Sequence, residues 1–242
     1  MKVTYIDHSG FYVELEHCAL LFDYSKGKLP AMDLRKPLYV FISHHHSDHF
    51  SPMLFPRLRG IPNITYILSE DIARQCSRST LGCLGMTDAE YECIHFVQAN
   101  KHYTFDDLEL GTLCSTDEGV AFLVRAEGQL IYHAGDLNLW KWPGDPEELN
   151  RHMEEQFKRI LRPLKGRHFD AAFLPLDPRQ GEWFALGFDY FMRHTDTDIA
   201  YPMHFWGQGE AVERLLELEC STPYRERIGR AEQVNRKVRV FA

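Results

Sequence analysis

A histidine-rich segment, residues 43–49, has the residue types and the spacing of a metal site. Five of the six positions from His44 to His49 are histidine or aspartate, and they follow the pattern His-x-His-x-Asp-His. The named places of the pattern are filled by His44, His46, Asp48 and His49. Neutral imidazole nitrogens and a carboxylate oxygen are ligands that suit zinc, iron or manganese. The segment therefore predicts that several metal ligands converge on one point.

The residues before this segment would position it. The apolar run 38–42 is typical of a buried strand, and a strand that ends in such a loop delivers its ligands together at its carboxyl end. The alternative is a solvated loop in which histidines cluster by chance and bind metal weakly. An expression tag is excluded because the cluster is internal and carries Ser and Asp at set places. We favour the metal site because a hydrophobic strand directly precedes the segment.

Two later strands also end in residues that can bind a metal. The predicted strand 130–132 runs into His133-Ala134-Gly135-Asp136, and the predicted strand 198–201 runs into Pro202-Met203-His204. A Gly-Asp pair alone is also a common turn. Asp136 is therefore a persuasive metal ligand only in combination with the histidine-rich motif. Asp136 and His204 are therefore the second and third signals of a metal site.

The composition bounds the classes of protein to consider. A chain of 242 residues with 44% hydrophobic residues suits one folded domain. We see no linker or repeat, and so we predict a single domain over residues 1–242. The 27 basic and 35 acidic residues give a net charge of −8 without a basic run. This balance argues against a nucleic-acid partner.

The terminus and the cysteines bear on location. The first residues have no long apolar region and no small-residue cleavage site, and no apolar run approaches the length that crosses a membrane. We therefore expect a cytoplasmic protein with no membrane partner. The six cysteines fit reduced thiols there. None forms a Cys-x-x-Cys pair, and we interpret them as core residues.

The remaining elements follow from hydrophobic period and turn residues. Strands are predicted at 2–6, 11–16, 19–22, 64–68, 91–97, 102–105, 108–114, 120–125, at the apolar run from residue 169, and at 237–241. Helices are predicted after the Ser51-Pro52 N-cap and at 69–76, 146–161, 184–193 and 210–220. Residues 77–90 are rich in Ser, Thr and Gly, and we interpret them as a mobile loop over the site.

On these motifs the chain resembles the metallo-β-lactamase-fold hydrolases over nearly its whole length, nearest their ascorbate-phosphate lactonase branch. The resemblance implies an α/β fold, the four-layer αββα sandwich of the metallo-β-lactamase type, with the site where strand-end loops meet at one edge. It also implies two divalent metal ions. His44 and His46 would hold the first, Asp48, His49 and His204 would hold the second, and Asp136 would bridge them.

Two residues near the N-terminus also match that branch. His8 and Asp23 lie where its members carry a Gly-His-Ser segment and an aspartate near the site. We interpret His8 as a turn histidine instead. Asp23 is at most a residue that stands behind a metal ligand.

The chain departs from the family at one ligand. The family usually supplies another histidine between the first motif and the Gly-Asp strand, and the matching region, residues 114–120, contains none. Asp117, Glu118 or water could take this place, and we assign it to Asp117. A carboxylate there moves the preference from zinc towards manganese or iron and weakens the pull of the metal on its water.

The predicted function is that of a metal-dependent hydrolase that attacks a small ester, lactone or phosphorylated metabolite with a metal-activated water. Zinc is the first choice of metal, with manganese or iron as alternatives. Asp48 would also orient the water or accept its proton as the catalytic residue. The partner is a small-molecule substrate, and no oligomeric state is assigned.

Further residues could shape the substrate pocket. Asp177 and Arg179 are candidate substrate contacts, with a surface ion pair as the alternative. Four tryptophans would suit a ring or an acyl group: Trp140, Trp142, Trp183 and Trp206.

Two other functions stay open. One is a non-catalytic metal-binding protein on the same scaffold, which the missing histidine favours. The other is a diiron redox protein, although such relatives normally need a flavin domain that this chain lacks.

Overall fold

The apolar runs of the first hundred residues build one mixed sheet. The computed structural model describes residues 1–233, and the order of this sheet is β13-β1-β2-β3-β4-β5-β6. Strands β1 to β3 are antiparallel, whereas β3 to β6 are parallel. The strand bounds are β1 (Lys2–Asp7), β2 (Gly10–Glu14), β3 (Ala19–Phe22), β4 (Leu38–Ile42), β5 (Ile64–Ser69), β6 (Ile94–Val97) and β13 (Glu232–Gln233).

A second mixed sheet follows, in the order β12-β11-β10-β9-β8-β7. Strands β7 to β10 form an antiparallel meander, and β10 to β12 are parallel. Glu127 and Gly128 have φ of 52° and 78° and so make the tight β9–β10 turn. The strand bounds are β7 (His102–Phe105), β8 (Leu108–Cys114), β9 (Val120–Ala126), β10 (Gln129–His133), β11 (His168–Pro175) and β12 (Asp196–Met203).

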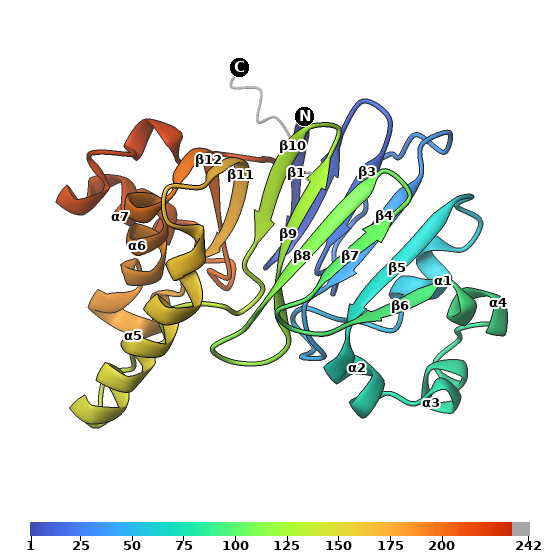
Figure 1. The fold of residues 1–242 in the computed structure, drawn as a ribbon, viewed down its shortest axis with the longest axis horizontal. Helices are drawn as coiled ribbons and strands as arrows, with labels where there is room; N and C mark the ends of the chain where they lie inside the picture. The colour runs from blue at the N-terminus through green and yellow to red at the C-terminus, as the bar shows by residue number, and fades with distance from the viewer. Residues whose placement is uncertain (234–242) are drawn as a thin grey trace, which may run out of the picture.

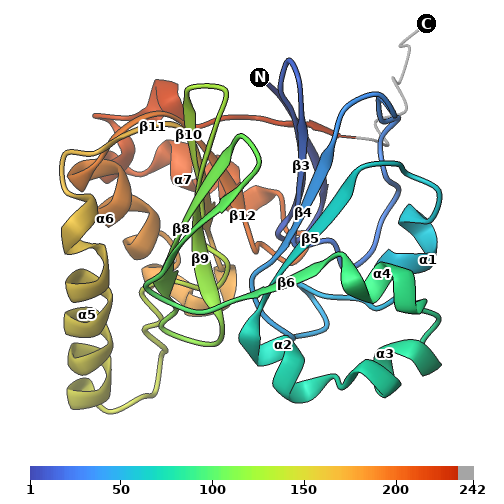
Figure 2. The same cartoon turned by 45° about the vertical axis from the view of Figure 1, so that its right-hand side comes forward.

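The sheets lie face to face with helices on both outer sides, as Figures 1 and 2 show. Four short helices cover the first sheet: α1 (Leu54–Leu58), α2 (Glu70–Gln75), α3 (Arg78–Cys83) and α4 (Asp88–Glu92). Three cover the second: α5 (Glu147–Leu161), α6 (Leu186–His194) and α7 (Glu210–Glu217). The predicted αββα sandwich is confirmed. No helix in the described residues is long and apolar enough to cross a membrane.

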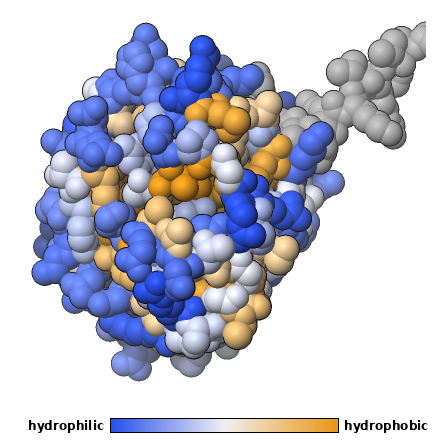
Figure 3. Space-filling view, turned by 90° about the vertical axis from the view of Figure 1, so that its right-hand side faces the viewer, coloured by the Kyte–Doolittle hydropathy of each residue, from blue (hydrophilic) through white to orange (hydrophobic). Residues whose placement is uncertain are grey.

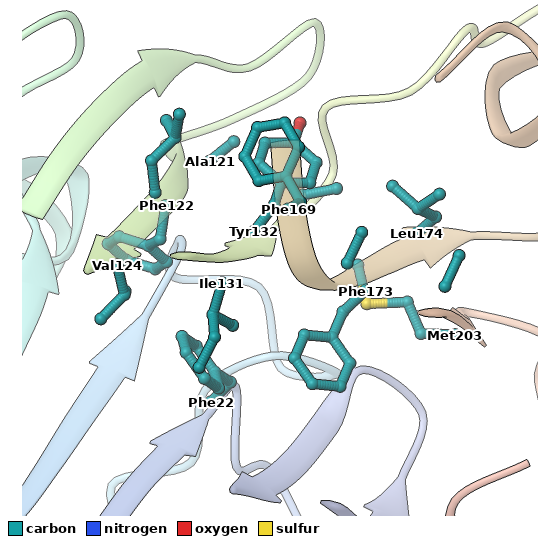
Figure 4. Packing of buried hydrophobic residues seen from close by; sticks show 14 of the residues in the cluster. Phe22, Ala121, Phe122, Val124, Ile131, Tyr132, Phe169, Phe173, Leu174 and Met203 are labelled. Atoms are coloured by element: carbon teal, nitrogen blue, oxygen red, sulfur yellow. The ribbon is translucent and has the colours of Figure 1, made fainter. Parts of the chain in front are cut away.

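The main core fills the space between the sheets and continues between the second sheet and α5 to α7 (Figure 4). Phe22 of the first sheet and Phe173 of the second have ring centroids 5.8 Å apart, and both are fully buried. Each such phenylalanine contributes about 1.5–3 kcal/mol relative to an exposed one. In β4, Tyr39 and Phe41 face this core, and the other residues face a second apolar cluster beneath α1 to α4. Burial on both faces explains why β4 is apolar throughout.

The interpretation of residues 77–90 as a loop over the site is wrong. Ser77 caps α3 by accepting the Thr80 N–H, and Thr87 forms a capping box with Glu90 at the start of α4. Leu81 packs into the apolar cluster on the outer face of the first sheet. Figure 3 shows the molecule from this side, where polar residues surround a smaller apolar area.

Two smaller predictions remain to be compared with the structure. The helix after Ser51-Pro52 begins only at Leu54, and Met53 is its N-cap. The strand predicted at 237–241 lies outside the described residues.

Candidate metal centre

Four strand ends meet at one edge of the sandwich. The histidine-rich segment follows β4, Asp136 follows β10, His204 follows β12, and His8 follows β1. Two glycines let these ends approach each other. A Cβ on Gly119 would lie 1.9 Å from the Ser43 carbonyl oxygen, and Gly135 has φ of 52° and leaves no room for a Cβ against Ser43.

The structure brings all seven predicted ligands together, with one addition, in two groups whose ligand atoms lie within 4.8 Å of one another. We call them the inner and the outer group. The inner group consists of His8, Asp48, His49 and His204. The outer group consists of His44, His46, Asp117 and Asp136.

Asp136 lies between the two groups. Its Oδ1 is 3.1 Å from His49 Nε2 and 3.3 Å from His204 Nε2, both in the inner group. Its Oδ2 is 3.6 Å from His44 Nε2 in the outer group. One carboxylate thus offers one oxygen to each group, which is the geometry that a bridging ligand needs.

Several of these atoms are buried without a hydrogen-bond partner. They are Nε2 of His8, His44, His49 and His204, and Oδ1 of Asp136. Leaving such an atom unpaired costs about 1–3 kcal/mol, so an arrangement that aims five of them at one space calls for a common partner. Imidazole nitrogens and a carboxylate oxygen are donors for a divalent cation. The residues present therefore fit the metal ions that the sequence predicted.

Two buried carboxylates stand behind the inner group. Asp23 Oδ2 is 2.7 Å from His49 Nδ1, and Asp177 Oδ2 is 3.1 Å from His204 Nδ1. Both aspartates are fully buried. A carboxylate on the far nitrogen fixes the ring orientation and raises its strength as a ligand. Asp23 also accepts hydrogen bonds from the Ser43 N–H and hydroxyl, so it anchors the start of the histidine-rich segment.

In the metal-free protein, the electrostatics around Asp136 favour positive charge between the ligands. Burial lowers the pKa of His49 and His204, but Asp136 outweighs it and raises the pKa of His49 well above its ordinary value and that of His204 to about 9. The pKa of Asp136 lies well below its ordinary value because, against the effect of burial, both imidazoles stabilise its charge. Protons supply the balancing charge here, and a bound cation would displace them.

The backbone is strained around the inner group. His8, Asp23, His204 and Trp206 have positive φ, between 40° and 61°. Such conformations cost about 1–3 kcal/mol each and cluster at functional sites. The His204 N–H donates to the His8 carbonyl at 3.1 Å, and their rings lie 4.2 Å apart. These contacts join the two sheets at the site.

A cavity of about 340 Å³ opens beside both groups. Its lining residues are His46, Asp48, Thr116, Asp117, Asp136, Trp140, Trp142, Met153, Arg179, His204 and Trp206. Trp140 and Trp142 stack at 5.7 Å with an interplanar angle of 2° and form one wall. The volume suits a small molecule.

Comparison with known proteins agrees with this geometry. The family model described as beta-lactamase superfamily domain matches residues 2–148. A UPF0173 metal-dependent hydrolase of Opitutus terrae is 30% identical over 217 residues, which cover 85% of this chain and 85% of that protein. The chain belongs to the beta-lactamase superfamily. As a member of it, and by its likeness to the hydrolase of Opitutus terrae, the chain is a metal-dependent hydrolase.

Solved structures show the same fold. Igni18, a metallo hydrolase from Ignicoccus hospitalis, is 17% identical with a TM-score of 0.59, covering 95% of this chain and 94% of that one. CmlA, a diiron beta-hydroxylase from Streptomyces venezuelae, is 14% identical with a TM-score of 0.56. That match covers 96% of this chain and 52% of CmlA, so the chain spans about half of that protein.

The main correction to the sequence-based site of this superfamily member concerns His8. The sequence left it as a turn histidine, but its Nε2 lies 3.2 Å from Asp48 Oδ2 in the inner group. Its place directly after β1 was the signal that could have found it, since the other sites also follow strands. Asp23 stands behind His49, as predicted.

Only some of the predicted pocket residues line the cavity. Asp177 is fully buried and contacts His204, so its interpretation as a substrate contact is wrong. Trp183 does not line the 340 Å³ cavity. Arg179 does line it, together with Trp140, Trp142 and Trp206.

Proposed function

We propose that this member of the beta-lactamase superfamily hydrolyses a small ester, lactone or phosphorylated metabolite at a centre for two divalent metal ions. The observation that carries the proposal is Asp136, whose Oδ1 faces the unpaired Nε2 atoms of His49 and His204 and whose Oδ2 faces the unpaired Nε2 of His44. His8, Asp48, His49 and His204 would hold one ion, His44, His46 and Asp117 the other, and Asp136 both.

When bound, the two ions would make a shared water acidic enough to attack at neutral pH and would polarise the bond under attack. The chain supplies the proton acceptor. Asp48 is 26% exposed and lines the cavity. Although burial raises the pKa of Asp48, its contact with His8 holds that pKa below the ordinary value, so the group is a carboxylate. Asp48 would orient the water or accept its proton as catalytic residue.

The donor sets favour different metals. Three imidazoles and one carboxylate in the inner group suit zinc. The outer group has Asp117 where the family usually has histidine, and its two carboxylates would accept manganese or iron. We also place the enzyme in the cytoplasm, and the six cysteines support this location because all are free thiols.

Metal content per chain tests the proposal, measured by elemental analysis on untagged protein beside Asp136→Ala. We expect about two equivalents in the wild type and a loss of bound metal and of ester hydrolysis in the variant. Asp107→Ala, an exposed aspartate in the β7–β8 turn, is the matched control and should change neither. One equivalent in the wild type would replace the dinuclear proposal by a mononuclear one. No metal after supply of zinc, manganese or iron would reject it.

Asp117 favours a second candidate, iron-based redox chemistry, because carboxylate and imidazole donors suit iron. Protein loaded with iron would then consume oxygen with a substrate present. Hydrolysis by zinc- or manganese-loaded protein without oxygen would reject this candidate.

A further inference from the structure

The cavity beside the metal centre has an arginine among its lining residues, Arg179. Its Nε lies 3.0 Å from both carboxylate oxygens of Asp177, and its Nη2 donates to Asp177 Oδ2. The guanidinium also lies 4.3 Å from the ring centre of Trp206 and 5.6 Å from that of Trp142. Within residues 1–233, its Nη1 has no hydrogen-bond partner.

A purely structural ion pair would not need this arrangement. Asp177 is fully buried and already accepts from the Arg179 backbone N–H and the Trp206 indole, in addition to its contact with His204. The Arg179 side chain is 47% exposed, so it reaches from a buried carboxylate to the open cavity. A guanidinium held in one place by two partners loses little further freedom when it binds a ligand.

The charges around the cavity indicate which kind of ligand group Arg179 could bind. The other ionisable groups on its wall are the carboxylates Asp48, Asp117 and Asp136 and two imidazoles, and all of them are ligands in the proposed function. In the proposed function, metal ions neutralise the three carboxylates. The Nη1 group of Arg179 still has its N–H donors available for a ligand. Planar guanidinium groups recognise carboxylates and phosphates through paired hydrogen bonds.

We propose that Arg179 binds an anionic group, a carboxylate or a phosphate, on a part of the substrate away from the bond that is broken. Trp142 and Trp206 flank the guanidinium and would hold the carbon skeleton that joins the two ends. The assumption that a bond of the substrate is hydrolysed rests on the proposed function, but the binding of the anion to Arg179 does not. The substrate class is thus narrowed to anionic esters, lactones or phosphorylated metabolites.

Equilibrium binding is the first test, because it does not need turnover. Tryptophan fluorescence would follow titrations of metal-loaded protein with benzoate, phenylphosphonate and neutral benzyl alcohol. We expect Arg179→Gln to weaken anion binding at least tenfold and to leave benzyl alcohol within twofold, with partial recovery in Arg179→Lys. A larger loss for phenylphosphonate supports the proposal with phosphate as the group, and a larger loss for benzoate supports it with carboxylate.

The chain offers a matched control. Arg35 pairs with Asp33 two residues before it through Nε and Nη2, as Arg179 does with Asp177, but it lies on the surface. Arg35→Gln should leave the binding of all three probes unchanged. An equal loss for neutral and anionic probes in Arg179→Gln, or no loss, would overturn the proposal. A loss of bound metal in this variant would also overturn it, because Arg179 would then act through Asp177 and His204.

Hydrolysis separates this proposal from the proposed function. The substrates are 4-nitrophenyl butyrate and mono-4-nitrophenyl succinate, which differ by an acyl carboxylate. We expect Arg179→Gln to lower kcat/KM at least tenfold for the succinate ester alone. If both esters are hydrolysed in a metal-dependent way and Arg179→Gln changes neither rate, the proposal of an anion site is rejected and that of a hydrolase is retained. Arg179-dependent binding without hydrolysis of any ester would keep the anion site and reject the hydrolase.

Discussion

The inner and outer groups share Asp136 and the same strand ends, yet they differ in what stands behind the ligands. In the inner group, His49 and His204 each have a buried carboxylate on the far nitrogen. In the outer group, the side chains of His46 and Asp117 are 41% and 45% exposed. Neither ring nitrogen of His46 has a hydrogen-bond partner in the described part of the chain. Carboxylates thus support two ligands of the inner group, whereas two ligands of the outer group are open to solvent and the buried His44 has only the Ser43 hydroxyl, 2.9 Å from its Nδ1.

In the proposed two-metal centre, this difference would make the two ions bind with unequal strength. Far-side hydrogen bonds fix an imidazole before a metal arrives, so binding costs less ordering there. An exposed and unsupported ligand must be ordered by the metal itself. We therefore expect the inner ion to bind first and more tightly, and the outer ion to be removed first by a chelator.

The largest effect should come from His49→Ala. This change removes a fully buried ligand of the inner group and leaves Asp23 and Asp136 without their imidazole. We expect the inner ion to be lost and turnover to fall by more than the about 100-fold that loss of a supporting partner costs. Elemental analysis and ester hydrolysis would measure both. His46→Ala is the comparison, and it should remove the outer ion alone; equal loss of both ions in the two variants would contradict the unequal centre.

A smaller effect is expected from Asp23→Asn, which keeps the size of the side chain but removes its charge. The amide supports His49 less well, so we expect the affinity of the inner ion to fall by about 10–100-fold. Competition with a fluorescent chelator would measure it. Asp33→Asn, at a half-buried aspartate that belongs to neither group, is the control. Unchanged affinity would mean that Asp23 serves only to anchor Ser43.

The pH dependence of the metal-free protein tests the inner group from another side. The pKa of His204 is raised to about 9 by Asp136, above the ordinary value of 6.5. Stability from the charged imidazole is therefore fully present below pH 6.5 and is lost as the pH rises through 9. We expect the free energy of unfolding of chelated protein to fall by on the order of 1–3 kcal/mol across this window.

Denaturant unfolding at pH 6.5 and 9 would measure the change. Zinc-loaded protein is the control, because a metal-bound His204 carries no proton to lose. His204→Gln in the metal-free protein should flatten the dependence. An equal fall in stability with and without zinc would show that other groups titrate.

The sequence revealed most ligands because they follow apolar strands. His44 to His49 come after β4, which is apolar throughout since it is buried on both faces, and Asp136 and His204 follow strands of the second sheet. The family motif then implied the sandwich and the two groups. Local sequence carried these predictions because a strand end and its ligand are neighbours in the chain.

Other parts depended on contacts between distant segments. His8 sits in a Ser-Gly turn, and only its contact with His204, from the other sheet, brings it into the inner group. The sequence predicts Asp177 as a substrate contact, with a surface ion pair as the alternative, and its burial behind His204 has no local signal. Residues 77–90 carry no clear helix signal in the sequence, because Ser and Thr occur both in loops and at helix caps.

The smallest effect, and the sharpest test of the comparison, is expected from Asp117→His. It restores the nitrogen ligand that the family usually has and removes a group whose pKa is raised by burial and by Asp136. We expect zinc to bind the outer group roughly tenfold more tightly, because imidazole suits zinc better than a carboxylate does. Chelator competition would then show two ions of more similar affinity. Glu118→His, at the exposed neighbouring position, should leave the difference as it is; if both variants behave alike, Asp117 is not the reason that the outer ion is weak.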